Sequence, residues 1–137
     1  MSEKNVNCLD PDVLRRNIPS QESLSGICIE NVEKGEVSFS IDIPDDVINY
    51  HDKIHGGFLS TLAEIAAGMA TYSHGVSNVA LSASINFLSA AGKGKVFVQA
   101  STIHIGRSTA VIRSLVNHEN GRQLVESTYT MFILGPA

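Results

Sequence analysis

The sequence predicts an α+β domain in which one antiparallel sheet curls around a single long helix. The helical stretch lies within residues 49–72 (NYHDKIHGGFLSTLAEIAAGMATY) and is apolar on nearly all sides. Four strand-like segments joined by short turns follow it, and one or two precede it. Strands joined by tight turns pair antiparallel. A sheet that curls around such a helix covers all of its apolar faces.

The central helix is predicted from the spacing of its large side chains. Phe58, Leu62, Ile65 and Met69 recur every three or four residues, which places them on one stripe. The other faces carry mainly alanine and glycine, and no proline interrupts the run. The run is too short to span a bilayer, which needs about 20 apolar residues, and Glu64 lies in its middle.

An N-terminal extension and one or two strands precede this helix. Residues 1–25 are predicted as helix and loop, with a short helix that begins near Pro11 and ends before Pro19. Residues 27–32 are a strand candidate. Residues 36–43 alternate between apolar and polar side chains, which indicates a strand with one solvent-facing side.

Turn signals divide the rest of the chain into strands. Glycine-containing turns separate the segments, and an Asn120-Gly121 pair indicates a hairpin. No internal repeat or second domain is visible, so residues 1–137 are predicted to form one domain. The four predicted strands are residues 79–88, 95–105, 109–116 and 122–134.

Composition excludes several classes of function. The chain is 43% hydrophobic and 18% charged, and its net charge of −4 comes without a basic stripe, so a general nucleic-acid role is not expected. The first residues, MSEKNVN, are polar and predict neither a signal peptide nor a membrane segment. Cys8 and Cys28 lack metal or redox spacing, which predicts a cytoplasmic protein.

Glu64 is the unusual residue of the central helix. A carboxylate on a buried helix is costly unless it is paired or lies in a cleft. One interpretation is therefore an acid/base or nucleophilic role. The other is that Glu64 lies on a narrow solvent-facing strip or pairs with a lysine or arginine.

The glycine pair Gly56-Gly57 stands where the helix begins. The first N–H groups of a helix have no internal partner, and the helix dipole is positive there. Without side chains at these positions, a ligand oxygen can approach the backbone closely, which would make an oxyanion-type donor site. The alternative is that the two glycines only form a tight turn.

Together these residues resemble the signature of hotdog-fold acyl-CoA thioesterases, of the phenylacetate-degradation and 4-hydroxybenzoyl-CoA thioesterase type. In that family an amide residue stands six positions before a His-Gly-Gly, and an acid stands nine positions after the histidine. Asn49, His55-Gly56-Gly57 and Glu64 keep both spacings (55 − 49 = 6; 64 − 55 = 9). The segment SASINFL at residues 82–88 is also similar to the strand that follows the family's helix.

The resemblance implies a role for each motif residue. The N–H of Gly56, with Gly57 beside it, would polarise the thioester carbonyl, and Glu64 would act as general base or as nucleophile. Asn49 would orient the water or the thioester, and His55 would hold the loop by bonding to Asn49. Neither a cofactor nor a metal is implied.

Distance along the helix implies that two subunits share the site. Nine helical residues span about 13 Å, so one chain cannot readily bring Glu64 and the glycines to one carbonyl. The family solves this by dimerising, with the acid facing the other chain's Gly56. The expectations are a homodimer with a shared active site, further paired into a dimer of dimers, and loss of activity in a monomer.

The resemblance also implies that basic residues in loops bind the coenzyme A phosphates. Arg107, flanked by Gly106 and Ser108, is the favoured phosphate contact, ahead of Lys93 and Lys95. The acyl group, aromatic or medium-chain, stays open, as does the choice between coenzyme A and acyl carrier protein.

The chain also departs from the family pattern. Members often carry Ser or Thr where this sequence has Gly68 and Ala80. Ser82, also a candidate substrate contact, and Thr61 are the candidates to substitute. The departures keep open a non-catalytic acyl-thioester binding module, while a hydratase or dehydratase would need an acid–histidine pair.

A metal site is the remaining alternative. His51 and His55 are four residues apart, as in helical zinc motifs. The glycines that follow favour a loop, and no third ligand fits, so a metal is not expected.

Overall fold

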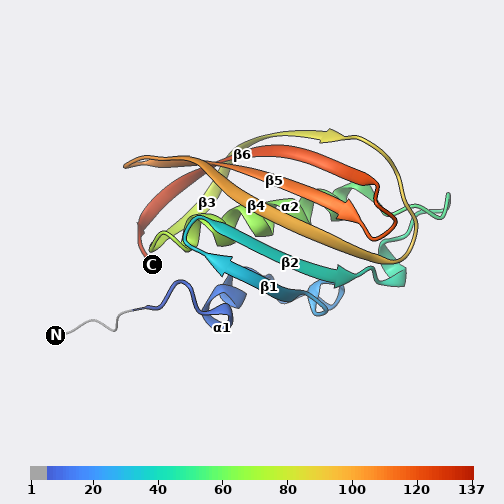
Figure 1. Ribbon diagram of the computed structural model, residues 1–137, viewed down its shortest axis with the longest axis horizontal. Coiled ribbons are helices and arrows are strands. Elements are labelled where there is room, and N and C mark those ends of the chain that lie inside the picture. Colours follow the sequence, from blue (N-terminus) through green and yellow to red (C-terminus); the bar gives the residue numbers. More distant parts are fainter. Residues whose placement is uncertain (1–5) are drawn as a thin grey trace.

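The computed structural model describes residues 6–137 as a six-stranded antiparallel sheet wrapped around one long helix (Figure 1). The strand order is β1-β2-β4-β5-β6-β3, which confirms the predicted hotdog arrangement. The helices are α1 (Pro11–Leu14) and α2 (Gly56–Tyr72), with short 3-10 turns η1 (Arg15–Asn17), η2 (Glu22–Leu24) and η3 (Asp45–Val47). The strands are β1 (Cys28–Glu33), β2 (Glu36–Asp42), β3 (Val76–Phe87), β4 (Lys95–Ile105), β5 (Thr109–His118) and β6 (Gln123–Pro136).

The predicted N-terminal extension is present from residue 6 onward, and its first five residues lie outside the described part. Asp10 caps α1 by accepting from the N–H of Asp12, and Pro11 takes the first helical position. Leu14 and Leu24 are fully buried, so this extension contributes to the core rather than only linking to it.

Helix α2 is the centre of the core because its side chains are small where the sheet comes close. Ala63, Ala66, Ala67 and Ala70 have no exposed surface, and α2 packs against β2 through β6. In Figure 1 the strands pass over one side of α2. One face of the helix stays open at Glu64, which is exposed.

Strand β3 begins earlier than predicted, at Val76 rather than residue 79. The N–H of Gly75 donates to the carbonyl of Tyr72 at 2.8 Å, and Gly75 has φ +91°. Glycine adopts this left-handed conformation at little cost, so the helix ends and the chain reverses within one turn. Val76 then pairs at once with Pro136.

Strand β3 is one of the two edge strands of the sheet, and it contains a bulge. Its pairing with β6 shifts between Ala80 and Ser82, leaving Leu81 as the extra residue. Ala80 is opposite buried Met131, whereas Ser82 is opposite Thr130 on the other face. The bulge therefore turns the side chain of Ser82 to the outer face of the sheet.

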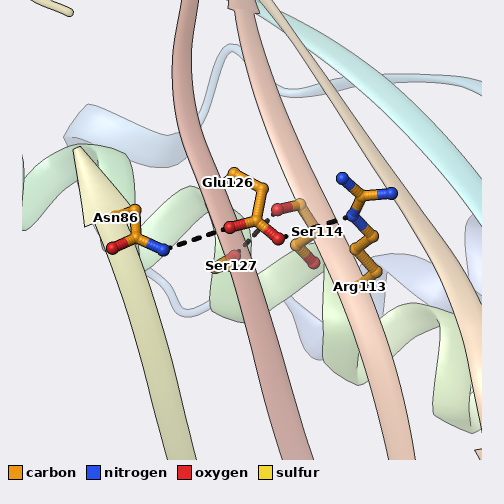
Figure 2. A network of polar contacts seen from close by, with 5 residues as sticks. All are labelled: Asn86, Arg113, Ser114, Glu126 and Ser127. Carbon is orange, nitrogen blue, oxygen red and sulfur yellow. Dashed lines mark hydrogen bonds and ion pairs between the residues drawn. The ribbon is translucent and has the colours of Figure 1, made fainter. Parts of the chain in front are cut away.

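A buried serine hydroxyl, that of Ser114, connects the sheet to α2 beside Glu64. Figure 2 shows Ser127 and Ser114 on neighbouring strands, and the Ser127 hydroxyl donates to the Ser114 carbonyl at 2.8 Å. The Ser114 hydroxyl donates to the carbonyl of Ala63 at 2.9 Å, and both serines are fully buried. This contact fixes the helix one residue before Glu64.

The same strands carry a polar network on the outer face. The Glu126 carboxylate accepts from Asn86 Nδ2 at 3.2 Å and lies 3.5 Å from Arg113 Nε (Figure 2). These three residues belong to β3, β6 and β5, so the network connects the edge strand to the two strands next to it.

Candidate active site

The first turn of α2 is built around His55. This residue is the N-cap, with extended backbone (φ −62°, ψ 131°), and its Nδ1 accepts from the N–H of Gly57 at 2.9 Å. A ring nitrogen that accepts carries no proton, so Nε2 bears the proton in the neutral ring. The cap therefore occupies the Gly57 donor and leaves Gly56 as the donor available to a ligand. Within residues 6–137, no acceptor bonds to the Gly56 N–H.

A cavity of about 280 Å³ adjoins this turn. Gly56 itself lies against Phe87, because a Cβ placed on Gly56 would meet the Phe87 ring at 3.3 Å. The aromatic ring and the bare backbone make one side of the first turn flat and apolar. The cavity is lined by Asp46, Val47, Ile48, His55, Gly57, Phe58 and Thr61.

Asn49 shapes the loop that leads into the helix. Its Oδ1 accepts from the backbone N–H groups of His51 at 2.9 Å and Lys53 at 3.1 Å. The side-chain bond between His55 and Asn49 that the resemblance implied is not formed in the described structure, because each acceptor is already bonded to backbone N–H groups. The Asn49 amide nitrogen remains available.

Glu64 lines a second cavity, of about 220 Å³, farther along the helix. Its carboxylate makes no ion pair within the described chain, where the two salt bridges are Lys93–Asp45 and Arg113–Glu126. Glu64 is thus exposed rather than buried, and no residue from 6 to 137 pairs with it. The cavity is lined by Asn17, Pro19, Glu64, Ile65, Gly68, Asn78, Val79, Ala80 and Met131.

Tyr129 lies beneath this part of the helix. Its hydroxyl donates to the carbonyl of Ser60 at 3.0 Å, and burial, followed by the negative charge of Glu64, raises the pKa of Tyr129 to about 12. The tyrosine therefore stays protonated and neutral beside the carboxylate over the whole physiological range.

The structure thus brings the motif residues to two places rather than one. His55 and Gly57 line the cavity at the first turn of α2, and Glu64 lines the other. Gly68 and Ala80 share the cavity of Glu64, whereas Thr61 lines the other one and Ser82 lies on the outer face.

Two residues of the Glu64 cavity, Asn17 and Asn78, were missed by sequence reasoning. They come from the N-terminal extension and from the start of β3. Asn78 was placed in the polar turn just before the strand predicted at 79–88, and its polar side chain there was the one available signal. Nothing in the local sequence connects Asn17 with Glu64.

Arg107 and Ser108 lie exposed in the turn between β4 and β5. The Ser108 carbonyl accepts from the N–H of Ile133 at 2.8 Å, and Ile133 is opposite Asn78 on the next strand. The turn is therefore two strands, about 10 Å, from the Glu64 cavity. Lys93, the alternative cation, is paired with Asp45.

Within residues 6–137, no group of three or more His, Cys, Asp or Glu side chains gathers in a metal-binding arrangement. Across the same residues, no helix has both the length and the apolar character needed to cross a bilayer.

A family model and a curated relative both match this chain, and they agree on one family. The thioesterase superfamily model matches residues 51–125. The chain is 33% identical over 116 residues to 1,4-dihydroxy-2-naphthoyl-CoA hydrolase of Listeria monocytogenes (serotype 1/2a, strain 10403S), covering 82% of this chain and 94% of that protein.

Several solved structures have a similar fold over about four fifths of this chain. A hypothetical thioesterase of Streptococcus pneumoniae TIGR4, solved with coenzyme A, is 30% identical, with a TM-score of 0.78 and coverage of 82% of this chain and 91% of that one. Two variants of a hypothetical thioesterase from the same organism have also been solved. In one an aspartate is replaced by alanine, and in the other a threonine sixteen positions later is replaced by alanine. The PaaI protein of Escherichia coli, from its phenylacetic acid degradation operon, is 25% identical, with a TM-score of 0.78 and 82% coverage of each chain. The chain therefore belongs to the thioesterase superfamily and is a hotdog-fold thioester hydrolase.

Proposed function

We propose that this protein hydrolyses an aromatic or medium-chain acyl-coenzyme A at sites shared by two subunits. Glu64 serves each site from one subunit, and Gly56, with His55 and Asn49 behind it, serves it from the other. The observation that carries the proposal is the separation of Glu64 and the helix N-terminus into two cavities of one chain. Each cavity holds groups that the other lacks.

The chemistry assigns one task to the first turn of α2 and another to the Glu64 cavity. The Gly56 N–H, unbonded within the described chain and at the positive end of the helix dipole, is suited to stabilise the oxyanion that forms at the thioester carbonyl. The unpaired Glu64 carboxylate is suited to accept a proton from the attacking water. Asn49 holds the loop before the helix, and His55 orients the first turn by occupying the Gly57 N–H.

The exposed edge strand supports the dimer. Residues 79–84 of β3 are exposed on both faces of the sheet, with Val79 at 49% and Leu81 at 61% exposure. A long apolar edge is a liability unless another strand covers it. A two-fold axis beside β3 would pair it with its own copy and run the partner helix in the opposite direction. The first turn of the partner's helix would then approach the Glu64 cavity.

A second association, into a dimer of dimers, is proposed for the outer sheet face. Large apolar side chains are exposed there or at the adjacent strand ends. They are more numerous than the singly scattered apolar residues of an ordinary protein surface. They are Phe97, Ile103, Ile105, Phe132 and Leu134.

Coenzyme A and an aromatic acyl group are favoured over the alternatives. The Listeria relative acts on a naphthoyl-CoA, and the Streptococcus structure holds coenzyme A. Arg107, in its exposed turn with Ser108, is the proposed phosphate contact. Phe87, against Gly56, gives the acyl group an apolar surface next to the proposed oxyanion donor. Unbridged Cys8 and Cys28 fit a cytoplasmic location.

Ala80 is a departure from the family pattern that bears on the turnover rate. The aspartate and threonine replaced in the Streptococcus thioesterase are sixteen positions apart, as are Glu64 and Ala80 (80 − 64 = 16). If the acids correspond, Ala80 stands where that protein has its hydroxyl.

The test is release of free thiol from naphthoyl-, phenylacetyl-, benzoyl- and octanoyl-CoA by wild type and Glu64→Ala. We expect an aromatic thioester to be hydrolysed and Glu64→Ala to lose about 10³-fold in kcat while still binding the thioester. Glu33→Ala, an exposed glutamate at the far end of β1, is the matched control and should keep full activity. Binding without hydrolysis by wild type would support the binding-module alternative instead.

A further inference from the structure

Gly68 leaves an open space in the cavity of Glu64, and two amide oxygens face it. Gly68 lies four residues, about one helical turn, after Glu64 on α2. A Cβ built on Gly68 would meet Asn17 Oδ1 at 3.7 Å and Asn78 Oδ1 at 3.8 Å, both ordinary contacts. Asn17, Glu64, Gly68 and Asn78 all line the same cavity.

The orientation of both amides is fixed by backbone carbonyls. Asn78 Nδ2 donates to the carbonyl of Gly68 at 3.3 Å, and Asn17 Nδ2 donates to the carbonyl of Leu14 at 3.0 Å. Only the nitrogen of an amide can donate to a carbonyl, so each Oδ1 is the amide atom that these bonds leave unused, and both oxygens lie beside the Cβ position of Gly68. The two atoms nearest the Gly68 Cβ position are therefore hydrogen-bond acceptors.

We propose that Asn78, assisted by Asn17, positions the water that attacks the thioester in this protein. The proposal rests on the proposed function. Water has two protons: one is donated to the Glu64 carboxylate, and the other to the Asn78 amide oxygen. Because none of these acceptors can donate back, the water lone pair is left free to face the carbonyl carbon.

The step is balanced as general-base hydrolysis. The water oxygen bonds to the carbonyl carbon as one of its protons passes to Glu64. The carbon–sulfur bond then breaks, and Glu64 passes the proton that it took from the water to the leaving thiolate. The products are the free acid and coenzyme A. Glu64 returns to its ionised form, so no other reactant is needed. This arrangement assigns Glu64 the role of base rather than nucleophile.

Asn78 is a positioning residue, and its effect is expected in kcat. Asn78→Ala should lower kcat about 10- to 100-fold, because a misplaced reactant costs that much, with KM changed less than about twofold. Asn86→Ala is the matched control: the same residue type on the same strand, outside the cavity and bonded to Glu126 on the outer face. It should retain kcat within about twofold of wild type.

A rescue separates positioning from structural support. The space above Gly68 accepts a side chain without a clash, and its φ is not positive, so Gly68→Ser should fold. In the Asn78→Ala background, the new hydroxyl can accept from the water. We expect Gly68→Ser/Asn78→Ala to recover at least about tenfold in kcat over Asn78→Ala. A purely structural role would lower Tm and would not be restored by this serine.

The outcomes distinguish this proposal from the function on which it rests. If wild type hydrolyses acyl-CoA, Glu64→Ala does not, and Asn78→Ala keeps full kcat, then Asn78 has no role and the proposed function stands. A loss in Asn78→Ala that Gly68→Ser fails to restore would also overturn the positioning role. If wild type hydrolyses none of the thioesters, the proposed function fails and this proposal fails with it.

Discussion

At its first turn helix α2 offers a backbone donor, whereas two turns later it offers an exposed carboxylate. The first region is closed by a histidine cap and an aromatic ring, and its free group is the Gly56 N–H. The second is open to solvent, and the atoms nearest the Gly68 Cβ position are two amide oxygens, which can accept hydrogen bonds. Carbonyl hydrolysis needs a donor for the oxyanion and an acceptor for the water proton. The difference between the two regions is the reason for proposing a shared site.

Removing the donor should have the largest effect. Gly56 is the first residue of α2 and follows the extended His55, so Gly56→Pro keeps a conformation that proline favours while deleting the N–H. We expect kcat to fall about 10²- to 10³-fold. Gly56→Ala keeps the N–H and places the same Cβ against Phe87, so it measures the steric part alone. Equal losses in both variants would remove the donor role from Gly56.

Loss of the proposed phosphate contact should have a smaller effect, confined to binding. Arg107→Ala should raise KM for an acyl-CoA about fivefold with kcat unchanged, as expected for an exposed charge contact. The same acyl group on N-acetylcysteamine, which lacks the phosphates, should show no change between variant and wild type. A change with both thioesters would mean that Arg107 acts elsewhere.

The Ser114 anchor tests whether the helix must be held beside Glu64. Ser114→Ala removes the bond to the Ala63 carbonyl and should cost about 1 kcal/mol of stability. Thermal unfolding should show a Tm lower by about 3–5 °C. Activity should fall by about threefold, because the acid is held less firmly. An unchanged Tm would show that packing alone fixes this part of α2.

The smallest effect expected is that of the Glu64 charge on the pKa of Tyr129. The pKa of Tyr129, raised to about 12, lies above the ordinary value of 10.0. The folded state therefore keeps a proton that the unfolded state loses, and the resulting stability is present below pH 10 and lost as the pH rises toward 12. Tyr129→Phe should reduce this alkaline loss, whereas Tyr50→Phe, 90% exposed, should not. In Glu64→Gln, absorbance titration should show a lower Tyr129 pKa.

Local patterns predict elements well but predict the site only in part. The strand at 95–105 and the helix start at Gly56 follow from alternation and from the glycine pair, and the structure has both. The face of Ser82 could not be predicted, because one bulged residue, Leu81, reverses the side-chain alternation after it. Asn17 and Asn78 meet Gly68 only through long-range packing, which no local spacing encodes.

Mixing two inactive variants tests the shared site most directly. Glu64→Ala and Gly56→Pro would be co-refolded in equal amounts. In a shared-site dimer, each mixed pair contains one site with both groups intact and one site with neither. Random pairing therefore predicts recovery of about a quarter of wild-type activity. If mixed dimers form, as mass spectrometry would show, and no activity returns, then Glu64 and Gly56 of the same chain act together and the account is wrong.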